Sequence, residues 1–208
     1  RRRPAFAFAM VAAAVALFAA MLAVSFPGSR SAIADFFGVE GSQVERLPTP
    51  PPGVTPTPFP PASDLPRTAR PASLSEIAQA LGFAPALPDG YGVPEEAFLV
   101  DYDGETVSIL RYAEFDLWQT RPRSSISFGK GLPGSVILLE ITVSGEPAYF
   151  IEGGAHIVAV FDEAGREIPG SERTVARNTL IFSTDRAFYR IETDLPRLDA
   201  LRIAETLP

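Results

Sequence analysis

The chain contains no cysteine, a single histidine and a single tryptophan among its 208 residues. Without cysteine it forms neither disulfides nor thiolate metal sites, and it offers no cysteine nucleophile. Because His156 has no second histidine beside it in the sequence, a zinc site built on two histidines is excluded. Chemistry that depends on thiolates or paired imidazoles is therefore absent from this chain.

Basic residues are also scarce. The 18 Lys and Arg stand against 25 Asp and Glu, a net charge of −7. With Arg1, Arg2 and Arg3 set aside, 15 basic residues remain against 25 acidic ones, a net charge of −10. An acidic chain of this kind argues against nucleic acid as a partner and against docking on anionic lipid through basic patches.

The longest apolar run is Ala5–Phe26, which holds 22 residues without a charge and only Ser25 as a polar side chain. As a helix it would reach roughly 33 Å, enough for the hydrocarbon core of a bilayer. We therefore predict a transmembrane helix over residues 5–26. The basic residues in the flank 1–4 predict that this end is cytoplasmic and that the chain after Phe26 is extracytoplasmic.

Two alternatives compete with a retained span. A cleaved signal peptide would use Ala32-Ile33-Ala34 as its cleavage site, but its apolar region would be shorter than residues 5–26. A buried core helix would be shorter and amphipathic. Because the sequence begins at Arg1 rather than Met, we also expect a cytoplasmic segment to precede it.

Two segments separate this run from the globular part. Residues 27–47 predict a short juxtamembrane helix, with Ile33, Phe36 and Phe37 on one face, and then a strand at Gln43–Leu47. Residues 48–71 predict an extended linker, since nine of the 19 residues from Pro48 to Pro66 are proline.

Residues 72–208 predict one extracytoplasmic domain. Ser73 and Glu76 have the spacing of a capping box at the start of a helix, and Gly82 is suited to its end. Asp103-Gly104 predicts a tight hairpin between two strands. A closing helix is expected from Pro196 to Leu207 with Asp194 as its cap.

The strands between these helices are short and joined by turn residues. They are expected at 97–102, 106–112, 136–143, 147–152, 155–161, 173–177, 179–183 and 187–193. The stretch 113–135 reads as irregular, with Ser124–Phe128 as a strand that the pattern shows poorly. Successive hairpins predict an α+β fold in which one curved antiparallel meander packs against an N-terminal and a C-terminal helix.

Four stretches contain residues that serve catalysis or ligand binding in other proteins. His156 lies on a predicted strand, and a Ser-His-Asp triad assembled from distant residues is the alternative, although G-x-S-x-G is absent. Asp101–Glu105 resembles a calcium loop without its distal glutamate. Gly129-Lys130-Gly131 with Gly134-Ser135 lacks the order of a phosphate loop. We therefore predict no catalytic, cofactor-binding or metal-ligating residue, and no cofactor.

Several stretches in succession resemble the membrane-anchored C-terminal part of bacterial anti-sigma-factor proteins. They are SAIADFFGVEGSQVERLP, SLSEIAQALGFAPALP, GEPAYFIEGGAH, RTVARNTLIF, FYRIE and ALRIAETL. The resemblance implies a zinc-binding cytoplasmic head that binds a sigma factor, and this head is absent from the present sequence. His156 and Asn178 match the pattern, where we interpret them as strand and turn residues.

These observations predict a non-enzymatic, single-pass protein of the cell membrane with an extracytoplasmic sensor or regulatory domain. The resemblance implies an anti-sigma-factor-like signalling protein that regulates transcription. Its partners would be the membrane, a sigma factor through the missing head, or an unknown extracytoplasmic ligand. A lipid- or lipoprotein-binding module is the alternative, which needs an apolar cavity of several hundred Å³. An anchored hydrolase is a third, which needs His156 beside a serine and a carboxylate.

Overall fold

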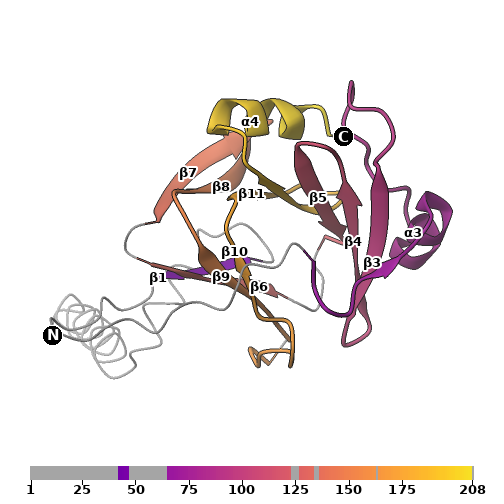
Figure 1. Ribbon diagram of the computed structural model, residues 1–208, viewed down its shortest axis with the longest axis horizontal. Helices are drawn as coiled ribbons and strands as arrows, with labels where there is room; N and C mark the ends of the chain where they lie inside the picture. Colours follow the sequence, from indigo (N-terminus) through magenta and orange to yellow (C-terminus); the bar gives the residue numbers. More distant parts are fainter. Residues whose placement is uncertain (1–41, 47–64, 123–126, 134–135, 163, 208) are drawn as a thin grey trace, which may run out of the picture. The chain divides into compact units, whose positions relative to one another are not determined.

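The computed structural model describes residues 42–46, 65–122, 127–133, 136–162 and 164–207. Within these ranges the chain folds mainly into strands, arranged in two sheets with two short helices (Figure 1). The elements in chain order are β1 (Ser42–Arg46), β2 (Arg70–Pro71), α3 (Leu74–Leu81), β3 (Glu96–Tyr102), β4 (Glu105–Arg111), β5 (Phe115–Thr120), β6 (Ser127–Leu132), β7 (Ile137–Val143), β8 (Glu146–Glu152), β9 (His156–Phe161), β10 (Arg173–Val175), β11 (Asn178–Ser183), β12 (Phe188–Thr193) and α4 (Arg197–Glu205).

The larger sheet has eight antiparallel strands in the order β2-β3-β4-β5-β12-β11-β8-β7. Two of its hairpins turn on residue pairs with positive φ. Asp103 and Gly104 have φ of 54° and 87°, and Ser144 and Gly145 have φ of 52° and 90°. Positive φ at both central residues is the type I′ geometry that matches strand twist. The hairpin predicted at Asp103-Gly104 is therefore confirmed, and the turn between the strands predicted at 136–143 and 147–152 has the same geometry.

The smaller sheet has four strands in the order β1-β6-β9-β10. β1 pairs in parallel with β6, whereas β6 and β9, and β9 and β10, pair antiparallel. β1 precedes the proline-rich stretch in the chain, yet it is a strand of this sheet. The smaller sheet is therefore assembled from strands that lie far apart in the sequence.

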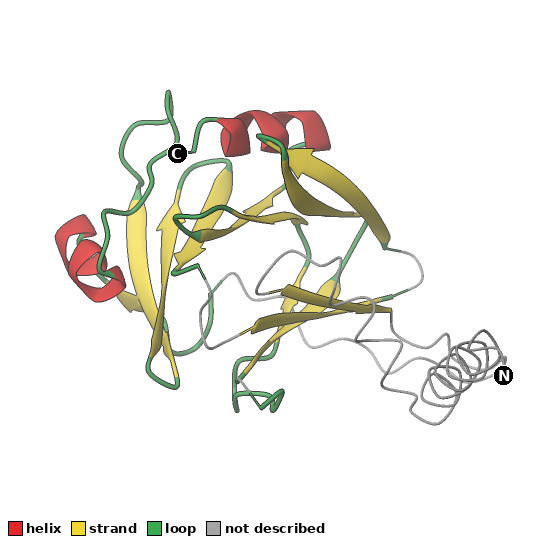
Figure 2. Cartoon of the chain, turned by 180° about the vertical axis from the view of Figure 1, so that it is seen from behind, coloured by secondary structure: helices red, strands yellow, loops and turns green. Residues whose placement is uncertain are grey.

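Both helices lie on the larger sheet, as Figure 2 shows from behind. α3 begins with the predicted capping box, in which Ser73 N donates to Glu76 Oε2 at 2.7 Å and Glu76 N donates to Ser73 Oγ at 3.2 Å. It ends at Gly82, whose φ is 79°. α4 differs from the prediction, because Pro196 occupies its N-cap without a side-chain hydrogen bond and Asp194 does not cap it.

Each face of the larger sheet is covered. One face packs against α3 and α4, and its core includes Ile77, Leu110, Phe150 and Ile203. The other face packs against the smaller sheet through a second core that includes Ile109, Trp118, Phe128, Val158 and Ile181. Because strand side chains alternate between faces, each central strand of the larger sheet contributes to both cores.

The predicted fold class is wrong for the described residues. They form two sheets rather than one meander, and their two helices span only eight and nine residues. Neither of these helices is long and apolar enough to cross a membrane. The predicted transmembrane helix at 5–26, the predicted juxtamembrane helix before Ser42 and residues 48–64 of the predicted linker lie outside the described residues. Residues 65–71 of the predicted linker 48–71 are described, and they include β2, which pairs with β3.

The stretch 113–135 is more regular than predicted, because it contains all of β5 and β6. All six residues of β5, FDLWQT, are buried although two of them are strongly polar. Asp116 pairs with Arg111, and the amide of Gln119 bonds both the N–H and the carbonyl of Ala86. Because these polar side chains have partners outside β5, they are buried there, and the strand does not show the usual alternation of apolar and polar residues.

Gly129 on β6 shows how tightly the smaller sheet packs. An added Cβ at this position would overlap the ring of Phe161, which lies diagonally across on β9. We predict that Gly129→Ala lowers the free energy of unfolding by about 1–3 kcal/mol, because the ring has to shift. Urea denaturation measures this. In a Phe161→Leu background the same substitution should cost clearly less, and an equal cost in both backgrounds contradicts the assignment.

Candidate functional site

Five ionisable side chains are buried between the two sheets. Lys130 on β6, His156 on β9 and Arg173 on β10 come from the smaller sheet, and Arg190 and Glu192 come from β12 of the larger sheet. Each is at most 6% exposed. Ionisable groups are rarely buried without partners, so this buried charge cluster is the most unusual chemical feature of the described residues.

Strand register brings these side chains together. Lys130 and Arg173 both lie opposite Val158 of β9, so the three form one row across the smaller sheet. Arg190 and Glu192 are two residues apart on β12 and therefore share a face. That face carries the second core, as the neighbouring Phe188 shows. The row and the pair therefore meet between the sheets.

Glu192 is the acceptor at the centre of the cluster. Arg173 and Arg190 both form ion pairs with its Oε1 atom. Burial raises the pKa of Glu192. The positive charges of Arg173 and then Arg190 lower it, and together they outweigh burial, so the pKa lies below its ordinary value. Burial lowers the pKa of Arg190 to about 10, so it stays protonated at neutral pH. The three groups form a charged Arg–Glu–Arg triad.

Trp118 supports both guanidinium groups of the triad. The Cζ atoms of Arg173 and Arg190 lie 4.5 Å and 5.1 Å from the centre of its ring. Cations at this distance are attracted to the face of an indole, and more strongly where water is absent. Its Nε1 has no hydrogen-bond partner among the described residues, so Trp118 acts here through packing and charge–ring attraction.

His156 is fully buried at the end of the cluster. Its Nε2 lies 3.3 Å from Oγ1 of Thr179, and its Nδ1 lies 3.4 Å from the carbonyl oxygen of Gly154. Burial first, and the charge of Arg190 second, lower its pKa to about 4, so the ring is neutral at pH 7. A neutral ring donates from Nδ1 to Gly154 and accepts at Nε2 from Thr179.

This geometry does not give the arrangement that a hydrolase needs. The two polar contacts of the His156 ring are a threonine hydroxyl and a backbone carbonyl, not a serine and a carboxylate. The ring also has no exposed surface where a substrate could reach it. The predicted position of His156 on a strand is confirmed, whereas its buried charged neighbours were not foreseen.

The other stretches singled out by sequence are parts of the fold. Asp101 accepts from the N–H of Gly104 at 3.0 Å, which closes the β3–β4 turn. The described residues contain no group of three acidic or histidine side chains arranged to hold a metal ion. Gly129-Lys130-Gly131 lies within β6 rather than in a loop, and Gly134-Ser135 lies outside the described residues.

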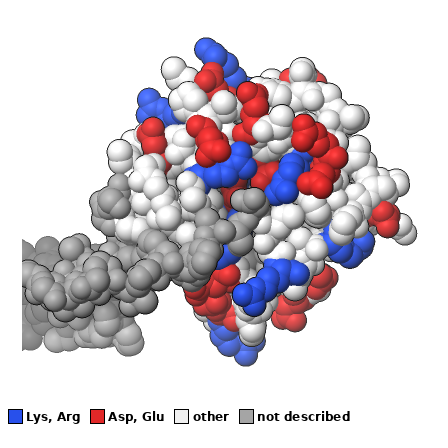
Figure 3. Space-filling model, viewed as in Figure 1, with Lys and Arg blue, Asp and Glu red and all other residues white. Residues whose placement is uncertain are grey.

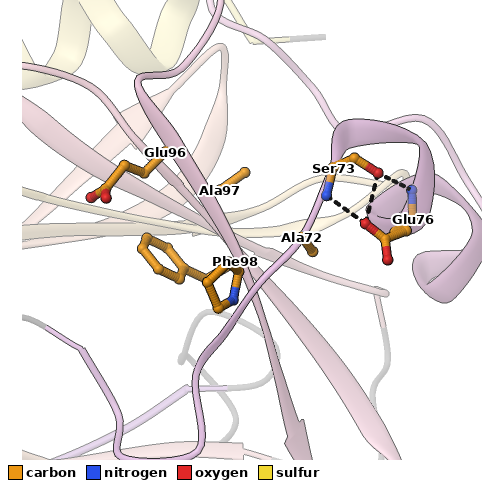
Figure 4. Close-up of a pocket in the computed structure, with 7 residues that line it drawn as sticks. Ala72, Ser73, Glu76, Glu96, Ala97 and Phe98 are labelled. Carbon is orange, nitrogen blue, oxygen red and sulfur yellow. Dashed lines mark hydrogen bonds between the residues drawn. The ribbon is translucent and has the colours of Figure 1, made fainter.

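A groove of about 420 Å³ opens on the surface beside α3 and the start of β3. Its carboxylates are Glu76 and Glu96, and Figure 4 shows Glu96 pointing away from Glu76. Glu76 is held by Ser73 in the capping box, and Glu96 pairs with Arg111 at 3.4 Å. Because these groups already stabilise the fold, the groove offers little free chemistry for a ligand.

A second ion-pair group surrounds Asp116 near the start of β5. Arg111 Nε lies 3.0 Å from Asp116 Oδ1, and Arg177 Nη1 lies 3.4 Å from Asp116 Oδ2. Burial raises the pKa of Asp116 even though Arg111 lowers it. On the described part of the face in Figure 3, acidic and basic side chains lie intermixed. This group stabilises strand ends rather than forming a surface of one charge.

Both faces of the larger sheet are filled by packed side chains and covering elements. The predicted lipid-binding alternative needs a large apolar cavity on one of these faces, whereas the described side chains of both faces are packed into the two cores.

Comparison with known proteins adds no further assignment. No family model, no curated protein and no solved structure matches this chain.

The triad predicts a large effect of its carboxylate on stability. Replacing Glu192 by glutamine leaves Arg173 and Arg190 buried without their shared negative charge. We expect Glu192→Gln to lower the free energy of unfolding by about 3–5 kcal/mol in urea at pH 7. Asp199→Asn, which breaks the exposed pair with Arg202, should cost less than about 1 kcal/mol. Similar costs for the two variants would contradict a buried triad.

His156 predicts that stability falls in acid. Between its folded pKa of about 4 and its ordinary value of 6.5, the unfolded chain binds more protons at this residue than the folded chain does. Stability from this residue is therefore complete above pH 6.5 and falls by up to about 3 kcal/mol as the pH drops to 4. Denaturation of wild type and His156→Gln at pH 4–7 isolates this contribution. Parallel pH profiles would contradict it.

Proposed function

We propose that the described residues form a non-enzymatic, extracytoplasmic regulatory domain of an anti-sigma-factor-like signalling protein at the cell membrane. The observation that carries the proposal is the position of β1. β1 is the described strand nearest to the apolar run at 5–26, and it is hydrogen-bonded into the smaller sheet. A change in the domain can therefore act directly on the chain segment that leads toward that run.

The route for such a change passes through the buried charge cluster. β1 pairs with β6, which carries Lys130, and β6 pairs with β9, which carries His156. Arg173 on β10 forms an ion pair with Glu192 on β12 of the larger sheet. The smaller sheet is thus fixed to the larger one by this ion pair and by the second core.

The sequence resemblance supports the signalling context. The resembling stretches contain α3, β8 and β10 and parts of β11, β12 and α4, together with the segment that contains β1. The sigma factor, bound by a cytoplasmic head, remains part of the proposal. The role of the described domain in this scheme is to set how firmly β1 is held.

A disulfide lock on β1 tests the proposal. Glu45 and Gly131 are register partners on β1 and β6, and the chain has no other cysteine with which a new pair could exchange. We expect Glu45→Cys/Gly131→Cys to fix the sigma-dependent transcript levels of the host in one state until a reductant is added. Transcript sequencing with and without reductant measures this.

Controls separate locking from damage. Glu45→Cys alone and Gly131→Cys alone should respond to conditions as the wild type does. Deletion of residues 65–208 should shift the same transcripts several-fold. A deletion that leaves transcription unchanged would falsify the regulatory role, whereas a double variant that behaves as the single ones do would remove β1 as its transmitter.

A further inference from the structure

β7 forms an open edge of the larger sheet. All seven of its residues pair with β8 on one side, and no described residue pairs with it on the other. We call this unpaired side the β7 edge. A row of free backbone N–H and C=O groups is a template for an added strand.

The opposite edge of the same sheet is protected. β2 has only two residues, one of which is Pro71, and α3 follows directly after it. β7, with the sequence ILLEITV, contains neither proline nor lysine, and Glu140 is its single charge. Short strands, proline and lysine are the usual means of blocking an edge, and β7 uses none of them.

The side chains of β7 differ between its two faces. Leu139 and Ile141 are half-buried on the face covered by α4, and Ile137 on that face is 51% exposed. α4 lies against β7 and exposes Leu198 at 63%. Glu140 points to the opposite face, is exposed, and forms no ion pair among the described residues. The β7 edge therefore presents an apolar strip on one face and one negative charge, that of Glu140, on the other.

The hairpin geometry shows which backbone groups face outward. The two-residue turn at Ser144-Gly145 makes Val143 and Glu146 a hydrogen-bonded pair, so every second residue of β7 back from Val143 also bonds β8. The backbone groups of Leu138, Glu140 and Thr142 consequently point away from β8. These three residues supply the free donors and acceptors of the β7 edge.

We propose that the β7 edge binds an extended peptide as an added antiparallel strand. The peptide would carry apolar side chains opposite Leu139 and Ile141 and a basic side chain opposite Glu140. Backbone hydrogen bonds supply affinity in this mode, and alternate side chains supply specificity. The inference rests on the proposed regulatory function for its meaning, since the peptide would then be the ligand that is sensed.

Charge favours a foreign peptide over a second copy of the chain. Antiparallel self-pairing about the middle of β7 places Glu140 opposite Glu140 of the other copy, and like charges directly opposite destabilise a strand pair. Each copy also carries a net charge of −7. A basic residue in the peptide instead gives Glu140 an ion-pair partner.

The test measures binding of a fluorescein-labelled peptide, Val-Thr-Val-Lys-Val-Thr-Val, to the full 208-residue chain in mild detergent by fluorescence anisotropy. In the proposed register its lysine meets Glu140 and its valines meet the apolar strip. We expect the same peptide with a central glutamate to bind about tenfold more weakly. We expect Glu140→Lys to reverse this preference, without a change in backbone bonding.

A backbone variant tests the strand mode separately. Thr142→Pro removes an outward N–H while sparing the bonds between β7 and β8, so binding should fall about tenfold with an unchanged melting temperature. Absence of saturable binding, or binding that neither variant alters, overturns the inference. So does a concentration-dependent dimer of the free chain that Thr142→Pro dissolves. Because none of these measurements reads signalling, failure of the peptide-binding inference can be told apart from failure of the proposed function.

Discussion

One buried carboxylate holds the two sheets of this protein in register. Glu192 receives both Arg173 from the smaller sheet and Arg190 from its own strand, and all three are at most 6% exposed. Removing three charges from water is costly, and their mutual attraction offsets that cost only in good geometry. A slip of β12 by one residue would turn Arg190 and Glu192 toward the helix-covered face. The triad therefore penalises any other register of the central strands.

The rest of the smaller sheet follows from this fixed contact. Arg173 fixes β10, β10 pairs with β9, β9 pairs with β6, and β6 holds β1. Apart from β10 and β9, these strands come from distant parts of the sequence. Loop closure between distant strands costs entropy that only tertiary contacts recover. The cluster and the second core supply those contacts, so the pairing of β1 with β6 depends on contacts made by other strands.

This dependence explains which parts of the fold the sequence predicted. The Ser73–Glu76 capping box and the Asp103-Gly104 turn are correct because each is decided by a few adjacent residues. β5 was missed because Asp116 and Gln119 find their partners in β4 and in the segment after α3. The smaller sheet was missed because no local pattern marks the pairing of β1 with β6. His156 was placed on its strand, but its buried cationic neighbours follow from register alone.

The buried charge cluster and the β7 edge divide the chemistry of the domain between them. The cluster is closed to solvent, so a peptide cannot bind there, whereas the β7 edge has outward backbone N–H and C=O groups and the exposed carboxylate of Glu140. The β7 edge and two members of the cluster, Arg190 and Glu192, belong to one hydrogen-bonded sheet, in which β7 is followed by β8, β11 and then β12. The β7 edge and the smaller sheet that holds β1 are therefore connected through β12, where the Glu192 carboxylate forms the ion pair with Arg173 of β10.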